Sequence, residues 1–117
     1  IAGSVRNLSF YSLDPEGMAV ADARSLPLAD LSVDCVVTDP PYGISATTLG
    51  VRTSELIDAF LINIVDKIKK GGRACIAAPK DVGIGKLVQK SGLVHLESHF
   101  VYVHRRLTRE IAVLKRD

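Results

Sequence analysis

The chain has 117 residues, of which 47% are hydrophobic and 24% are charged, and its formal net charge is +2. This balance is typical of a globular domain with one core. No apolar run is long enough to cross a bilayer, and no signal peptide is visible. Cys35 and Cys75 stand in apolar, strand-like runs, so we expect buried, reduced thiols and a cytoplasmic location. The cysteines and histidines lack the spacing of a metal site, so no metal is expected.

Charge is distributed unevenly along the chain. Residues 1–66 hold three basic residues against nine acids, whereas residues 67–117 hold twelve basic residues against four acids. A basic half suits a partner that carries phosphates, such as a nucleic acid. The alternative is that the lysines are simply solvated on helix surfaces. The sequence leaves both readings open, because no basic stripe is interleaved with aromatic residues.

The first predicted element is a helix at 2–12, where apolar side chains recur at helical spacing. A turn at 13–17 leads to a short predicted strand at 18–22, which ends in Asp22. After a loop, residues 33–38 (VDCVVT) form a predicted strand. Its apolar centre is typical of a parallel strand that is covered on both faces.

The strongest helical pattern follows the loop 39–53. Its apolar residues repeat at helical spacing and form one wide face: Leu56, Ile57, Phe60, Leu61, Ile64, Val65 and Ile68. Thr53 or Ser54 is predicted to cap the start of this helix. Three lysines at its end, followed by Gly71 and Gly72, predict that the helix continues to residue 70.

Residues 73–78 (RACIAA) are predicted to form a second buried strand, and residues 81–91 a weaker helix that ends at Gly92. Residues 93–104 and 109–116 are predicted to be two strands joined by a short turn, which makes an antiparallel hairpin. Strands that alternate with helices imply an α/β fold with a mostly parallel sheet. The C-terminal hairpin adds an antiparallel strand to that sheet.

The turn DPPYG at 39–43 is the clearest functional signal in the sequence. Ligands bind at the carboxyl ends of the strands in such sheets, so Asp22 and Asp39 should both face that crevice. For Asp22, an ordinary turn residue is an equal alternative. For Asp39 this alternative is weaker, because two adjacent prolines fix φ and remove backbone donors, which is a costly way to build an ordinary turn.

A rigid carboxylate, a proline carbonyl and an aromatic ring suit chemistry on an exocyclic amine of a nucleic-acid base. Such an amine is a poor nucleophile, because its lone pair is delocalised into the ring. A carboxylate and a backbone carbonyl can accept its two N–H bonds and stabilise the developing positive charge. A tyrosine can stack on the base, and stiff prolines keep these groups in position.

The motif DPPYG resembles motif IV of the S-adenosylmethionine-dependent methyltransferases that act on exocyclic amines of nucleic-acid bases. Three further stretches narrow the resemblance to the archaeal family that methylates N2 of guanosine at tRNA position ten. DPEGMAVADARSLPL (14–28) is similar to the strand whose terminal acid contacts the adenine of the methyl donor. GISATTLG (43–50) is similar to the loop after the motif, and VHRRLTREIAVL (103–114) to the closing hairpin.

This resemblance extends over almost the whole chain and implies S-adenosylmethionine as cofactor and tRNA as partner. It implies that Asp39, Pro40, Pro41 and Tyr42 form the catalytic turn. It also implies that the donor is bound by Asp22, Ala23 and Asp39. The residues that it implies for substrate binding are Tyr42, Gly43, Ser45, Thr47, Arg105, Arg106 and Arg109. A solvated polar side chain remains the alternative for each loop residue and each arginine.

The resemblance also implies a Rossmann-like methyltransferase fold, of which residues 1–117 are a partial domain. We expect its first strands, its glycine-rich donor loop and any RNA-binding THUMP domain to be absent, and this piece to be inactive alone. An unpaired edge on the strand at 33–38 then predicts that this piece forms a homodimer or an aggregation-prone monomer. A small zinc-containing activator is a further expected partner. The alternatives are a DNA adenine-N6 or ribosomal RNA guanine-N2 methyltransferase, and a non-catalytic module that binds RNA or a partner.

Overall fold

The computed structural model describes residues 1–41 and 52–117. Its elements in chain order are α1 (Ala2–Phe10), β1 (Val33–Thr38), α2 (Thr53–Ile64), β2 (Ile68–Pro79), the short 3₁₀ helix η2 (Lys80–Val82), α3 (Ile84–Ser91), β3 (Val94–His104) and β4 (Leu107–Lys115). Within these residues, no helix has the length and apolar character needed to cross a membrane.

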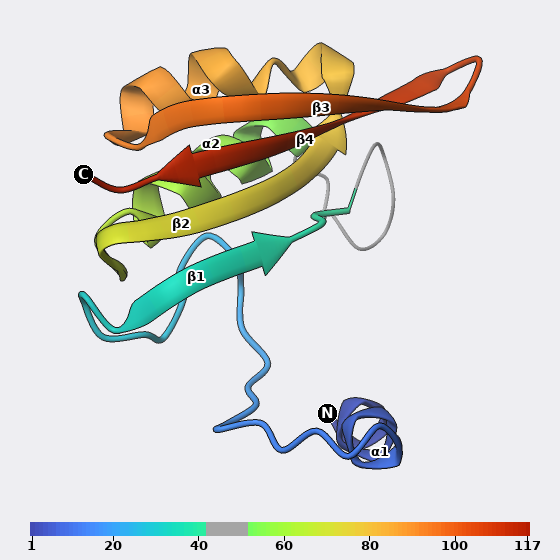
Figure 1. Cartoon of the computed structure of the whole chain (residues 1–117), viewed down its shortest axis with the longest axis vertical. Helices are drawn as coiled ribbons and strands as arrows, with labels where there is room; N and C mark the ends of the chain where they lie inside the picture. The colour runs from blue at the N-terminus through green and yellow to red at the C-terminus, as the bar shows by residue number, and fades with distance from the viewer. Residues whose placement is uncertain (42–51) are drawn as a thin grey trace.

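The described strands form one mixed sheet in the order β1-β2-β4-β3. Strand β1 pairs with β2 in parallel, and β4 pairs antiparallel with both β2 and β3. Thr38 lies opposite Ile76, and Pro79 lies opposite Arg109. The ends of β1 and β2 and the start of β4 therefore share one edge of the sheet. The tip of the β3–β4 hairpin projects beyond this edge (Figure 1).

Helices α2 and α3 cover one face of the sheet, and the core lies between them and the strands (Figure 1). Strand alternation puts Ala74, Ile76 and Ala78 on this covered face, where all three are fully buried. The buried core residues are Ile57, Phe60, Leu61, Ile64, Ile68, Ala74, Ile76, Ala78, Ile84, Val88, Leu93, Ala112 and Leu114. The candidate site lies at the carboxyl edge of this packed sheet.

The strand predicted at 33–38 is present as β1, but its predicted burial on both faces is wrong. Val37, on the face opposite the helices, is 79% exposed. Cys35 is also exposed and Cys75 is half-buried, so the prediction of two buried thiols is wrong as well, although both thiols are free. The physical reason is that α2 and α3 lie on the other face while α1 stands apart from the sheet (Figure 1).

Two predicted elements differ in the structure. Residues 18–22 form no strand, because no neighbouring strand in the described part of the chain offers them a ladder of hydrogen bonds. The helix predicted to reach residue 70 ends at Ile64. The carbonyl oxygens of Asp66 and Lys67 instead accept hydrogen bonds from the backbone amides of residues 31–33, and β2 begins directly afterwards.

The start of α2 also differs from the prediction. Arg52 occupies the cap position, and neither Thr53 nor Ser54 caps the helix because both lie in its first turn. The predicted weaker helix is split into η2 and α3, and it ends at Gly92 with φ of 88° as predicted. The C-terminal hairpin is confirmed, with Arg105 and Arg106 as its turn.

Candidate functional site

The carboxyl edge of β1 and β2 gathers three segments from different parts of the chain. Asp39, Pro40 and Pro41 follow β1, and the residues of η2 follow β2. The hairpin reaches the same edge through Arg109, which pairs with Pro79. In open α/β sheets this edge is the usual ligand site, and two pockets lined by described residues open on it.

The first pocket, here called the turn pocket, has a volume of about 170 Å³. It is lined by Ala23, Thr38, Asp39, Pro40, Pro41, Leu56 and Phe60. Ala23 reaches it because the backbone amide of Leu26 donates a hydrogen bond of 3.0 Å to the side-chain oxygen of Asn63 on α2. The structure thus brings together four residues that the sequence had linked to the donor or to catalysis: Ala23, Asp39, Pro40 and Pro41.

Asp22 lies next to this group but does not line the turn pocket. Its carboxylate accepts hydrogen bonds of 2.9 Å from the backbone amide of Arg24 and of 2.6 Å from the guanidinium of Arg24. The hydrogen bond from the Arg24 side chain has the larger effect and that from its backbone the smaller, and together they lower the pKa of Asp22 from 3.8 to about 2. The Asp22 carboxylate is thus already paired with a residue two positions further along the chain.

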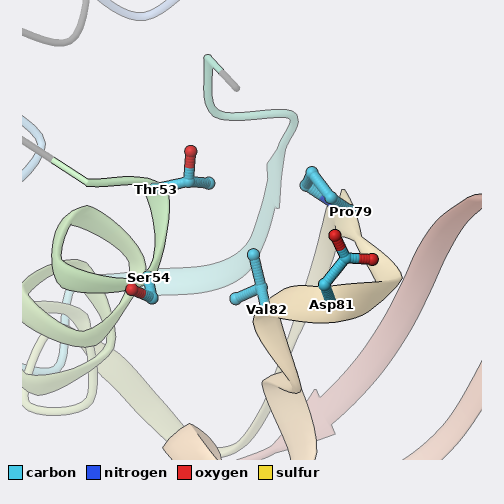
Figure 2. Close-up of a pocket in the computed structure, with 5 residues that line it drawn as sticks. All are labelled: Thr53, Ser54, Pro79, Asp81 and Val82. Carbon is cyan, nitrogen blue, oxygen red and sulfur yellow. The ribbon is translucent and has the colours of Figure 1, made fainter. Parts of the chain in front are cut away.

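The second pocket, here called the strand-end pocket, has a volume of about 290 Å³ and is lined by Thr53, Ser54, Pro79, Asp81 and Val82. Figure 2 shows the first turn of α2 on one side of it and the end of β2 with η2 on the other. The two pockets are neighbours, because α2 lines the turn pocket with Leu56 and Phe60 and the strand-end pocket with Thr53 and Ser54.

The hairpin carries the predicted basic residues beside this edge. Arg105 and Arg106 are exposed in the turn, and the backbone amide of Arg106 donates a hydrogen bond of 3.1 Å to Nδ1 of His104. Arg109 is half-buried at the start of β4. The predicted residues Tyr42, Gly43, Ser45 and Thr47 lie outside the described residues.

The sequence reasoning missed Asp81, although the signal for it was present. Asp22 and Asp39 were singled out as acids that follow strands, and Asp81 stands two residues after the end of β2. The strand was predicted to end at residue 78 and a helix to begin at 81, so Asp81 was read as part of that helix. The reasoning also missed Lys80, whose ammonium lies 5.6 Å from the centroid of the Phe100 ring.

The described residues contain no group of three or more histidines, cysteines or acids that could hold a metal ion.

Residues 1–109 match the family model described as "RMKL-like, methyltransferase domain". The chain belongs to this methyltransferase family. It is 37% identical over 116 residues to the tRNA (guanine(10)-N2)-dimethyltransferase of Methanothermobacter thermautotrophicus, with 99% of this chain and 34% of that protein covered. It is 36% identical over 122 residues to the enzyme of the same name from Methanocaldococcus jannaschii, with 98% and 31% covered. The chain thus spans about a third of the length of these curated relatives.

Solved structures agree on the fold of this methyltransferase family member. The crystal structure of TrmN from Thermus thermophilus superposes with a TM-score of 0.71 at 22% identity, covering 99% of this chain and 33% of that one. An S-adenosylmethionine-dependent methyltransferase from Methanosarcina mazei superposes with a TM-score of 0.66 at 10% identity, covering 99% and 78%. The predicted Rossmann-like methyltransferase fold is confirmed.

Proposed function

We propose that this chain belongs to an enzyme that transfers a methyl group from S-adenosylmethionine to the exocyclic N2 amine of a guanosine in tRNA. One observation carries the proposal: Asp39, Pro40 and Pro41 close a pocket at the carboxyl edge that also contains Ala23. A rigid carboxylate beside a donor pocket is the arrangement that amine methylation needs. The names of the archaeal relatives support guanosine N2 in tRNA as the acceptor.

The turn pocket fits the adenine of S-adenosylmethionine. Leu56 and Phe60 give it apolar walls, while Thr38 and Asp39 add polar groups at the strand end. A flat base needs such walls and a few placed polar atoms. Ala23 adds a small residue against which a ring can lie. Contact between Asp22 and the donor requires its carboxylate to leave Arg24 or to share it.

The proposed reaction uses the chain's own groups to prepare the amine. S-adenosylmethionine, when bound, supplies an electrophilic methyl group on a positively charged sulfur. The Asp39 carboxylate and the Pro40 carbonyl accept hydrogen bonds from the two N–H groups of N2 and localise the nitrogen lone pair. The N2 nitrogen then forms a bond to the methyl carbon as the carbon–sulfur bond breaks and its electron pair returns to sulfur. Asp39 stabilises the positive charge until the extra proton leaves N2 for solvent.

The hairpin arginines and the residues after Pro41 are proposed to contact the RNA substrate. Arg105, Arg106 and Arg109 stand on the hairpin beside the carboxyl edge, where guanidinium groups suit RNA phosphates. Tyr42 is proposed to stack on the base. Gly43, Ser45 and Thr47 are proposed to shape its pocket.

Further partners are also part of the proposal. A homodimer through the free edge of β1 is supported by the position of that strand at the end of the described sheet. Sedimentation of a monomer at high concentration contradicts it. A small zinc-containing activator and a cytoplasmic location complete the proposal. Co-purification of the epitope-tagged protein from whole-cell extract tests for the activator, and fractionation of the same cells tests the location.

The deciding experiment is methyl transfer by the full-length protein to unmodified tRNA, ribosomal RNA and duplex DNA, followed by nucleoside analysis. N2-methylguanosine in tRNA is the expected product. Asp39→Asn is expected to lower kcat by roughly 10²-fold or more, because an oriented charge is lost in the transition state, while tRNA affinity changes little. The matched control is Asp34→Asn, an exposed carboxylate on β1, the strand that Asp39 follows. N6-methyladenine in DNA, or full activity in Asp39→Asn, contradicts the proposal.

A further inference from the structure

We propose that the strand-end pocket receives the target guanine and that Asp81 selects guanine by accepting a hydrogen bond from its N1–H. This inference rests on the proposed function, because it assigns the base-binding site of the same reaction. It adds a residue that reads the identity of the base, whereas Asp39 acts on the amine.

The strand-end pocket lies close to the proposed donor site. The turn pocket and the strand-end pocket are both lined by the first two turns of α2, so they are adjacent along the carboxyl edge. The turn Asp39–Pro41 lines the turn pocket, where the donor adenine fits. In the proposed reaction the acceptor base approaches the methyl group from beyond this turn, and the strand-end pocket opens beside it.

The lining of the strand-end pocket combines apolar and polar groups, as a base-binding site requires. Pro79 and Val82 supply apolar walls, and Thr53, Ser54 and Asp81 supply polar groups. Figure 2 shows the Asp81 carboxylate and the Thr53 side chain on opposite sides of the opening. The volume of about 290 Å³ is just below the roughly 300–1,000 Å³ range of small-molecule sites, so the pocket suits a ligand as small as a single base.

The Asp81 carboxylate is accessible to a ligand in the strand-end pocket. It is exposed, and within residues 1–41 and 52–117 it has no hydrogen bond and no ion pair. By contrast, the Asp22, Asp30 and Asp34 carboxylates each pair with a cation. An acceptor with unused capacity at the mouth of a pocket can take a donor from a ligand without breaking an existing interaction.

The selectivity follows from the pattern of donors on the base. Guanine has a hydrogen on N1 beside its N2 amine, and a carboxylate accepts that hydrogen. Adenine has a lone pair on N1, which a carboxylate repels. The synthetic base 2,6-diaminopurine keeps the N2 amine but also has a lone pair on N1. Asp81 should therefore reject it, even though the amine that is methylated is present.

The test compares tRNA transcripts with guanosine or 2,6-diaminopurine at the methylated position, using the full-length protein. The native protein should prefer guanosine by roughly 10²-fold or more in kcat/KM. Asp81→Asn offers an amide N–H to the N1 lone pair, so the preference should fall by at least about tenfold, with a gain on diaminopurine. Asp34→Asn is the matched control and should leave the preference unchanged.

A binding measurement makes the inference independent of turnover. Competition between the two RNAs for the native protein should favour guanosine, and Asp81→Asn should reduce this difference. Asp81→Glu keeps the acceptor and should retain a preference for guanosine, which separates lost recognition from a damaged fold. An unchanged preference in Asp81→Asn, with N2-methylguanosine still formed, overturns this inference and leaves the proposed function standing. Absence of N2-methylguanosine from every substrate contradicts the proposed function instead, and the binding comparison still decides the role of Asp81.

Discussion

Helix α2 buries five side chains against the sheet, whereas helix α1 buries none and stands apart from it (Figure 1). The difference extends to the regions around them. Every fully buried apolar residue that the structure describes lies between Leu56 and Leu114. In residues 1–41, large apolar side chains such as Phe10 and Val20 are 80% and 84% exposed. A helical pattern is therefore enough to form a helix, but the helix stabilises the fold only where its apolar face packs against another surface.

The largest expected effect comes from truncating a buried residue of α2 and an exposed residue of α1. Ile57 is fully buried in α2, and Val5 is 46% exposed in α1. Ile57→Ala should reduce the free energy of unfolding by about 2–5 kcal/mol, through lost burial and a residual cavity. Val5→Ala should change it by less than about 0.5 kcal/mol. Urea denaturation of the two variants measures both values, and equal losses would contradict the difference in packing between α2 and α1.

A smaller effect is expected at the seam where β1 meets β2. A Cβ atom on Gly72 would lie 2.5 Å from Cγ2 of Ile68 and 2.8 Å from the carbonyl oxygen of Asp34. Gly72→Ala should therefore cost about 1–3 kcal/mol, because backbone has to move to make room. In α3, a Cβ on Gly85 meets nothing within 4 Å, so Gly85→Ala should instead stabilise by up to about 1 kcal/mol. Thermal unfolding of both variants tests the opposite signs.

The smallest effect is expected at Asp22, in the exposed region. Arg24 lowers the pKa of Asp22 to about 2. The contact therefore stabilises the folded chain fully at pH values above the ordinary pKa of 3.8, and this stabilisation is lost as the pH falls through about 2. Both groups are exposed, so the gain in stability is small and is screened by salt. Carboxyl NMR titration should give a midpoint near 2, and Arg24→Ala should raise it. An unmoved midpoint in Arg24→Ala argues against the contact.

The elements that depend on local signals could be predicted from the sequence. A run of apolar residues at helical spacing predicted α2, which contains five of the seven, and two strand patterns around Arg105 and Arg106 predicted the hairpin. The boundary between α2 and β2 could not be predicted, because residues 65–70 contain good helix formers. Distant amides from residues 31–33 decided it by taking the carbonyls of Asp66 and Lys67. The strand at 18–22 failed for the same kind of reason, since a parallel strand exists only beside a partner.

Half of the candidate site could be predicted in the same way. The stiff turn marked Asp39, Pro40 and Pro41, and the strand-end rule pointed to the region of Ala23. The strand-end pocket could not be predicted, because it joins the start of α2 to the residues after β2 across 25 residues of sequence or more. Only the parallel pairing of β1 and β2 brings those segments to one edge. Asp81 gains its meaning from that pairing and not from its neighbours in the chain.

Strand β4 is the last strand along the chain, yet it lies inside the sheet between β2 and β3. This order has a consequence for synthesis on the ribosome. Strands β1 and β2 emerge first and can pair only across the α2 crossover, which is a slow, non-local contact. The hairpin β3–β4 closes over a two-residue turn and can form quickly once it is made. Until it docks on β2, the apolar face of α2 is only half covered, so a nascent chain halted before Leu107 should be the form that a holding chaperone retains.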